Sequence, residues 1–151
     1  SPKGKIDFDN VLYENNEIWK LALEKQGLLL SYAPKNIVND IDLVKYAILN
    51  KSNSYVYIGE ELENNIELAI FTVNSDKYAI KLIPEHFLEN KDFIDGIKNI
   101  FENKIETLNL MIEVEPKLGI LYDIIKKNER KEELHKTLIN KDEIKKKKNK
   151  I

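Results

Sequence analysis

Residues 41–65 read IDLVKYAILNKSNSYVYIGEELENN, and this stretch decides the fold because both flanking segments repeat its pattern. Residues 16–40 read NEIWKLALEKQGLLLSYAPKNIVND, residues 66–90 read IELAIFTVNSDKYAIKLIPEHFLEN, and the three segments align without a gap. Residues 91–115 match the pattern at their start and no longer match it further along. A fixed period of roughly 20–50 residues is typical of solenoids and related arrays. The chain is therefore predicted to contain one small unit stacked on itself.

Each unit opens directly after an Asn or Asp, and the second residue of each unit is acidic. The side-chain oxygen of such a residue can cap a helix by accepting a hydrogen bond from a free backbone N–H. An acid in the first turn lies at the positive end of the helix dipole. The pattern therefore predicts that a helix begins in every unit. The cap positions are Asn15, Asp40, Asn65 and Asn90, and the acids are Glu17, Asp42, Glu67 and Asp92.

The rest of the unit predicts two short helices joined by a turn. Leu43, Val44, Ala47 and Ile48 have the spacing of a helix with one buried face. In the three units the first helix is expected to stop near residues 27, 52 and 77. Of these positions only Gly27 is an ideal helix terminator. A second apolar run follows it. Such short helices are marginal alone, so neighbouring units must bury them. Three columns carry the pattern: apolar Leu30, Tyr55 and Ile80; small Ala22, Ala47 and Thr72; and the breakers Pro34, Gly59 and Pro84.

This spacing resembles a short helical repeat of about 25 residues, rich in Ala and Leu, that occurs in tandem in bacteria and protists. The family is catalogued only as a domain of unknown function. The resemblance implies an all-helical fold, and it implies no activity and no catalytic residues. The third unit departs from the pattern at Thr72-Val73. The residues that carry the resemblance are Glu17-Ile18-Trp19 with Ala22-Leu23, Asp42-Leu43-Val44 with Ala47-Ile48, and Gly27, Ala33 and Asp40.

The C-terminal third is predicted to close the array with helices. Ile97, Ile100, Phe101, Ile105, Leu108 and Ile112 suggest one long helix that Pro116 interrupts. Leu118, Leu121, Tyr122 and Ile125 then mark another helix that could cover the last layer. The predicted fold is all-α, a short α-solenoid of two-helix repeats with a helical C-terminal cap. The repeat domain is expected to span residues 1–125, with units 16–40, 41–65, 66–90 and a degenerate 91–115, before a charged helical or frayed tail, 126–151.

Composition indicates one soluble domain. The chain has 151 residues, of which 42% are hydrophobic and 33% charged, and it contains no long apolar run that could span a membrane. Because cysteine is absent, disulfides and thiolate metal sites are excluded. A reducing cytoplasm is the expected location, although a chain without cysteine is equally tolerated outside the cell.

Charge divides the chain unevenly. Residues 1–125 carry a net charge of −8 and residues 126–151 a net charge of +6. One interpretation is that the tail contacts nucleic acid or anionic lipid. The other is a solvated helix that rests against the acidic repeats of its own chain. The first interpretation would use Lys145, Lys146, Lys147, Lys148 and Lys150.

Catalytic motifs are missing. The two histidines, His86 and His135, lie in a turn and in a charged helix, and neither has a positioned partner in sequence. No glycine-rich phosphate loop or nucleophile elbow is present. The sequence therefore predicts no enzyme, no metal site and no cofactor.

Tyrosines at one repeat position are the remaining candidates for binding. Tyr32 and Tyr57 occupy the same column, and Leu82 continues it. Aromatic residues at fixed repeat positions are most often core residues. The alternative is a groove along the stacked units that accepts a peptide or a partner helix, where the polar tip of tyrosine suits a wet edge. We expect a non-enzymatic protein-interaction or scaffolding module whose partner is a protein or peptide.

Overall fold

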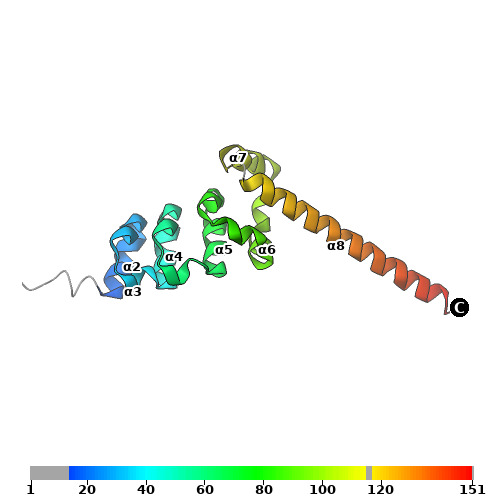
Figure 1. Cartoon of the computed structure of the whole chain (residues 1–151), viewed down its shortest axis with the longest axis horizontal. Coiled ribbons are helices and arrows are strands. Elements are labelled where there is room, and N and C mark those ends of the chain that lie inside the picture. Colours follow the sequence, from blue (N-terminus) through cyan, green and yellow to red (C-terminus); the bar gives the residue numbers. More distant parts are fainter. Residues whose placement is uncertain (1–13, 115–116, 151) are drawn as a thin grey trace, which may run out of the picture.

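The computed structural model describes residues 14–114 and 117–150. All regular secondary structure within these two ranges is helical, with no strand. The elements follow one another in a row in chain order, and a long final helix projects from the end of that row (Figure 1). The predicted all-α class is therefore confirmed.

The elements recur with the period of the sequence. Three ten-residue helices, α2 (Asn16–Lys25), α4 (Ile41–Asn50) and α5 (Ile66–Ser75), start 25 residues apart. A six-residue 3-10 helix follows each of them: η1 (Gly27–Tyr32), η2 (Ser52–Tyr57) and η4 (Lys77–Leu82). A short third element completes each segment: α3 (Lys35–Val38), η3 (Glu60–Leu62) and η5 (Glu85–Glu89). The next segment opens with α6 (Lys91–Ile97).

Each segment thus holds three helical elements, where the sequence pattern predicts two. The breaker column at Pro34, Gly59 and Pro84 has extended backbone and separates the second element from the third. One apolar residue then anchors each third element in the core: Ile37, Leu62 and Phe87 are at most 6% exposed. The third element is too short to show a helical period in the sequence, so only its burial reveals it.

The predicted N-caps are confirmed at all four positions. The Asn15 Oδ1 accepts hydrogen bonds from the backbone N of Glu17 and Ile18, at 3.0 and 3.3 Å. The Asp40 carboxylate accepts equivalent bonds from Asp42 and Leu43. Asn65 and Asn90 each accept one bond, from Leu68 at 2.9 Å and Phe93 at 3.0 Å. These bonds satisfy backbone donors that a helix start leaves without an internal partner.

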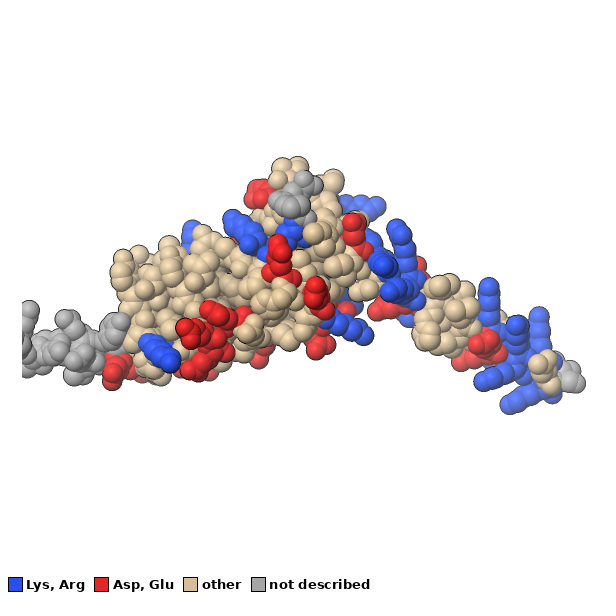
Figure 2. Space-filling model, viewed as in Figure 1, with Lys and Arg blue, Asp and Glu red and all other residues tan. Residues whose placement is uncertain are grey.

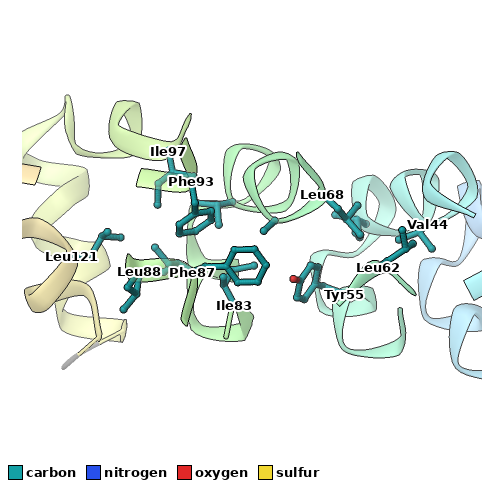
Figure 3. Packing of buried hydrophobic residues seen from close by; sticks show 14 of the residues in the cluster. Val44, Tyr55, Leu62, Leu68, Ile83, Phe87, Leu88, Phe93, Ile97 and Leu121 are labelled. Carbon is teal, nitrogen blue, oxygen red and sulfur yellow. The ribbon is translucent and has the colours of Figure 1, made fainter. Parts of the chain in front are cut away.

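One continuous apolar core runs along the row (Figure 3). Consecutive α-helices contact one another, α2 with α4, α4 with α5 and α5 with α6, and η2 contacts both η1 and η4. Leu30, Tyr55 and Ile80, which share one sequence column, are all buried. Residues of this sequence column are therefore buried in each of the three segments.

The C-terminal third differs from the prediction. The expected single helix after Ile97 is wrong, because a 3-10 helix, η6 (Lys98–Phe101), ends before a separate helix, α7 (Lys104–Val114). Asn103 starts α7 by accepting hydrogen bonds from the backbone N of Ile105 and Glu106. Sequence reasoning took the apolar spacing as continuous and overlooked this cap.

The predicted final helix is present as α8 (Lys117–Lys148), which buries Leu118, Leu121 and Ile125. The Lys117 Nζ donates a hydrogen bond to the backbone carbonyl of Ile83, which ties the start of α8 to the third segment. The helix continues without a break across residues 125 and 126, where the sequence suggested a boundary. In the described residues, none of the helices is long and apolar enough to cross a membrane.

Candidate protein-interaction surface

Helix α7 turns a row of large aliphatic side chains towards solvent. Ile105, Leu108 and Ile112 are 72%, 61% and 80% exposed. Their spacing of three and four residues places them on one face, which we call the α7 stripe. Thr107, Leu110 and Val114, on the other side of the helix, are buried against the core. Contiguous exposed apolar surface of this kind marks interaction sites in soluble proteins.

An open groove lies next to the α7 stripe, between α7 and α8. It has a volume of about 540 Å³, and Leu108 belongs both to its wall and to the stripe. Its other apolar walls are Phe101, Met111 and Tyr122. The rings of Phe101 and Tyr122 meet edge to face with centroids 5.7 Å apart, so they hold each other in place. We call this the α7–α8 groove.

Charged side chains surround the α7–α8 groove. Lys98, Glu102 and Lys104 contribute to one side, and Lys126 and Glu129 come from α8. The Lys126 ammonium lies 5.5 Å from the centroid of Tyr122 and 3.1 Å from the Glu129 carboxylate. The site therefore combines an apolar floor with a polar rim, which is the composition of a protein-binding surface.

The two tyrosines proposed from sequence lie on the surface. Tyr32 ends η1 and is 74% exposed, and Tyr57 ends η2 and is 42% exposed. Because η1 and η2 contact each other, the two positions belong to neighbouring layers. The third member of the column, Leu82, is half-buried. No pocket described for this part of the chain includes either tyrosine, so their binding role stays a prediction.

A second aromatic column is covered by neighbouring layers. The Lys20 ammonium lies 5.0 Å from the ring centroid of Tyr46, and the Lys45 ammonium lies 5.3 Å from that of Phe71. In each pair the lysine precedes the aromatic residue by 26 positions, so the contact repeats with the layers. Lys45 also pairs with Glu67. These aromatic residues serve the contacts between layers.

The basic tail is helical almost to its end. Lys145 to Lys148 form the last turn of α8, and Lys150 lies beyond it. Four consecutive lysines on a helix point in different directions, because each residue turns by about 100° from the last. The five lysines singled out from sequence are all exposed, but they do not form one patch.

No catalytic constellation is evident in the residues described. His86 is exposed and stacks on Phe87, and His135 is exposed on α8. Within residues 14–114 and 117–150, no group of three His, Cys, Asp or Glu residues could hold a metal ion. Tyr55 has the most strongly shifted pKa. Burial raises this pKa to about 12, and the Glu63 carboxylate makes a smaller contribution. It is 4% exposed, so a substrate could not reach it.

The sequence places Ile105, Leu108 and Ile112 at helical spacing in a helix that is predicted to close the array. It predicts neither the exposure of these side chains nor the α7–α8 groove beside them. A signal was present: six apolar residues lie around α7, more than one buried face can use. They are Ile105, Leu108, Leu110, Met111, Ile112 and Val114.

Comparison with known proteins gives one match. Residues 15–63 match the model of a family described as a domain of unknown function (DUF4116). No curated protein and no solved structure matches the chain. The matched segment includes α2 to η3 and excludes α7 and α8, so the candidate surface lies outside it.

Proposed function

We propose that this chain is a short α-solenoid that serves as a non-enzymatic, cytoplasmic protein-interaction module. The observation that carries the proposal is the α7 stripe beside the α7–α8 groove. Its three aliphatic side chains are at least 61% exposed, although the same helix also supplies core residues. Recurrence of the elements at 25-residue steps, with contacts between consecutive layers, supports the solenoid.

The expected occupant is an amphipathic helix from a partner protein. Such helices place apolar anchors at spacings of three, four and seven residues into a hydrophobic groove. The α7 stripe has the same spacing, so two helices could pack side by side with their anchors interleaved. The pairing of Phe101 with Tyr122 means that the groove wall is formed before the partner arrives, which lowers the entropic cost of binding.

Selection from a library of displayed helical peptides tests this function. Wild-type protein should enrich peptides with large apolar residues at helical spacing. We expect Leu108→Asp to weaken their binding by about tenfold or more, since a carboxylate would be placed in an apolar contact. Leu49→Asp on α4 is the matched control, because Leu49 is 62% exposed and Leu108 is 61% exposed. Failure to enrich any peptide, or equal binding to both variants, would contradict the groove as the site.

The tyrosine pair predicted from sequence and the α7–α8 groove predict different results in this peptide-binding assay. If Tyr32 and Tyr57 form the binding surface, the double variant Tyr32→Ser and Tyr57→Ser should lose the selected peptides and Leu108→Asp should keep them. The α7–α8 groove predicts the reverse. The two sites are therefore distinguished by one set of measurements.

An alternative function is binding of nucleic acid or an anionic membrane through the tail. The observation in its favour is that the outer part of α8 carries many lysines and that each of residues 131–150 is exposed (Figure 2). Such binding weakens steeply with salt, because released counterions drive it.

A further inference from the structure

One side of the outer part of α8 carries mostly cations. Steps of three and four residues place Leu134, Leu138 and four cations on one side, which we call the basic face. The opposite side is mixed, since the rotation of about 100° per residue places Glu129, Glu132 and Glu143 there together with Lys136 and Lys147. The cations of the basic face are Lys131, Lys141, Lys145 and Lys148.

Most of the basic face lies away from the rest of its own chain, although Lys131 lines a groove that Glu89 and Asp95 also line. Every residue from 131 to 150 is exposed, including Leu134 at 62% and Leu138 at 52%. Figure 1 shows why: α8 is one continuous helix that leads away from the row of repeats. The interpretation that the tail rests against the acidic repeats of the same chain is therefore wrong for residues 134–150.

The complementary surface lies at the other end of the molecule. Glu14, Asp40 and Glu61 line a shallow groove of about 820 Å³ beside α3, and Lys35 is the one cation in its lining. Glu60 and Glu63 are exposed neighbours on and after η3. We call these five residues the acidic edge, and Figure 2 shows acidic side chains gathered along the row of repeats on that side. A hydrogen bond from the Glu61 backbone N to the Asn39 Oδ1, 3.1 Å long, holds η3 against α3.

We propose that two copies of this chain associate reciprocally, with the basic face of each α8 lying on the acidic edge of the other. Charge complementarity selects this occupant: the four cations of the basic face, with Asp142 beside them, face the five carboxylates of the acidic edge. A reciprocal arrangement uses the same two surfaces twice and closes as a dimer. It also gives support to about 30 Å of helix, which would be marginal as an isolated segment in water. This association uses surfaces other than the α7–α8 groove and goes beyond the proposed function.

Sedimentation of charge-reversed variants tests the dimer. Wild-type chain should dimerise at low ionic strength and dissociate at high salt, where exposed charges are screened. We expect the variant Lys141→Glu, Lys145→Glu, Lys148→Glu to weaken self-association by about tenfold or more. The matched control is Lys136→Glu, Lys146→Glu, Lys147→Glu, which changes the net charge equally on other sides of the same helix and should still dimerise.

A charge swap makes the assignment specific. The edge variant Glu60→Lys, Glu61→Lys, Glu63→Lys should be monomeric alone, like the variant with a reversed basic face. An equal mixture of the two should form a heterodimer, because every reversed tail then meets a reversed edge. Circular dichroism checks that each variant remains helical.

Three outcomes would overturn the dimer. One is a wild-type chain that stays monomeric at low salt, and another is a mixture of the two variants that does not associate. The third is a monomer whose basic face binds vesicles of phosphatidylcholine and phosphatidylserine, or RNA, which would favour the alternative function. Peptide binding in the α7–α8 groove is measured separately, so failure of one proposal leaves the other intact.

Discussion

At the residue scale, Tyr55 is the position where the core departs from its own pattern. Leu30 and Ile80 occupy the same column in the neighbouring layers, and all three side chains are buried. Tyr55 adds a hydroxyl, whose end points towards Phe87 (Figure 3). Among the residues described, this hydroxyl and the Ser54 Oγ are buried without a hydrogen-bond partner. An unsatisfied buried polar group costs about 1–3 kcal/mol, so the layer loses stability there.

Tyr55→Phe should therefore keep or raise the free energy of unfolding at neutral pH, and it should change the response to alkali. The pKa of Tyr55 is about 12 in the folded chain and 10.0 as its ordinary value. Between these values the unfolded chain has lost the proton and the folded chain keeps it, so stability falls as pH rises. We expect the wild type to lose about 1–3 kcal/mol more than Tyr55→Phe between about pH 9 and pH 12.

Urea unfolding of both proteins across this pH range measures the effect. The two proteins differ only at residue 55, so the difference between the curves isolates its hydroxyl. If the free energy of unfolding fell equally with pH in the wild type and in Tyr55→Phe, the Tyr55 hydroxyl would be accessible to water.

At the scale of elements, the first two layers are joined where η1 begins. Sequence reasoning assigned Gly27 to the end of a helix, but its importance is the space it leaves. A Cβ at this position would lie 2.2 Å from the Ala47 carbonyl oxygen and 2.9 Å from the Ser54 Oγ. The Asn50 side chain closes the same junction: it accepts a hydrogen bond from the Gly27 N at 2.7 Å and donates to the carbonyls of Glu24 and Lys25. The Asn50 side chain of α4 thus links the second layer to the backbone of the first layer, where α2 ends and η1 begins.

Gly27→Ala should lower the free energy of unfolding by about 1–3 kcal/mol or more, because a backbone atom cannot move aside for the new methyl group. Gly119→Ala on α8 is the matched control. A Cβ there meets no atom within 4 Å, and alanine favours a helix over glycine by about 0.5–1 kcal/mol. Thermal or urea unfolding followed by circular dichroism should therefore move in opposite directions for the two variants. Equal effects would mean that the close approach of η1 to α4 is not a constraint.

At the scale of the whole molecule, the core that stabilises the fold and the exposed outer part of α8 are separate regions. The core cluster runs from Leu23 to Ile125, and α8 leaves it after its first residues. The remaining part of α8 contributes charge and length to the surface and buries nothing in the core of its own chain. Loss of that part should leave the fold intact.

Removal of residues 134–151 should change the midpoint of thermal unfolding very little at high salt, where self-association is suppressed. Leu121→Ala should instead cost about 2–5 kcal/mol, since Leu121 is fully buried at the base of α8. Circular dichroism gives both the helix content and the midpoint. A large loss of stability on truncation would show that the outer part of α8 supports the core.

The sequence by itself determined the helical class, the 25-residue period and the four N-caps. These features are local: a cap needs only a side chain such as Asn65 and the backbone of the next turn, and a period is present in the order of residues. Tertiary structure alone decided the third element of each layer and which face of α7 is exposed. The break at Asn103 is another local cap, which the continuous apolar spacing around it obscured. The position of the next layer decides which apolar residues lose contact with water. Ile105 and Leu110 are both apolar in sequence, and only packing against η4 and α8 makes one exposed and the other buried.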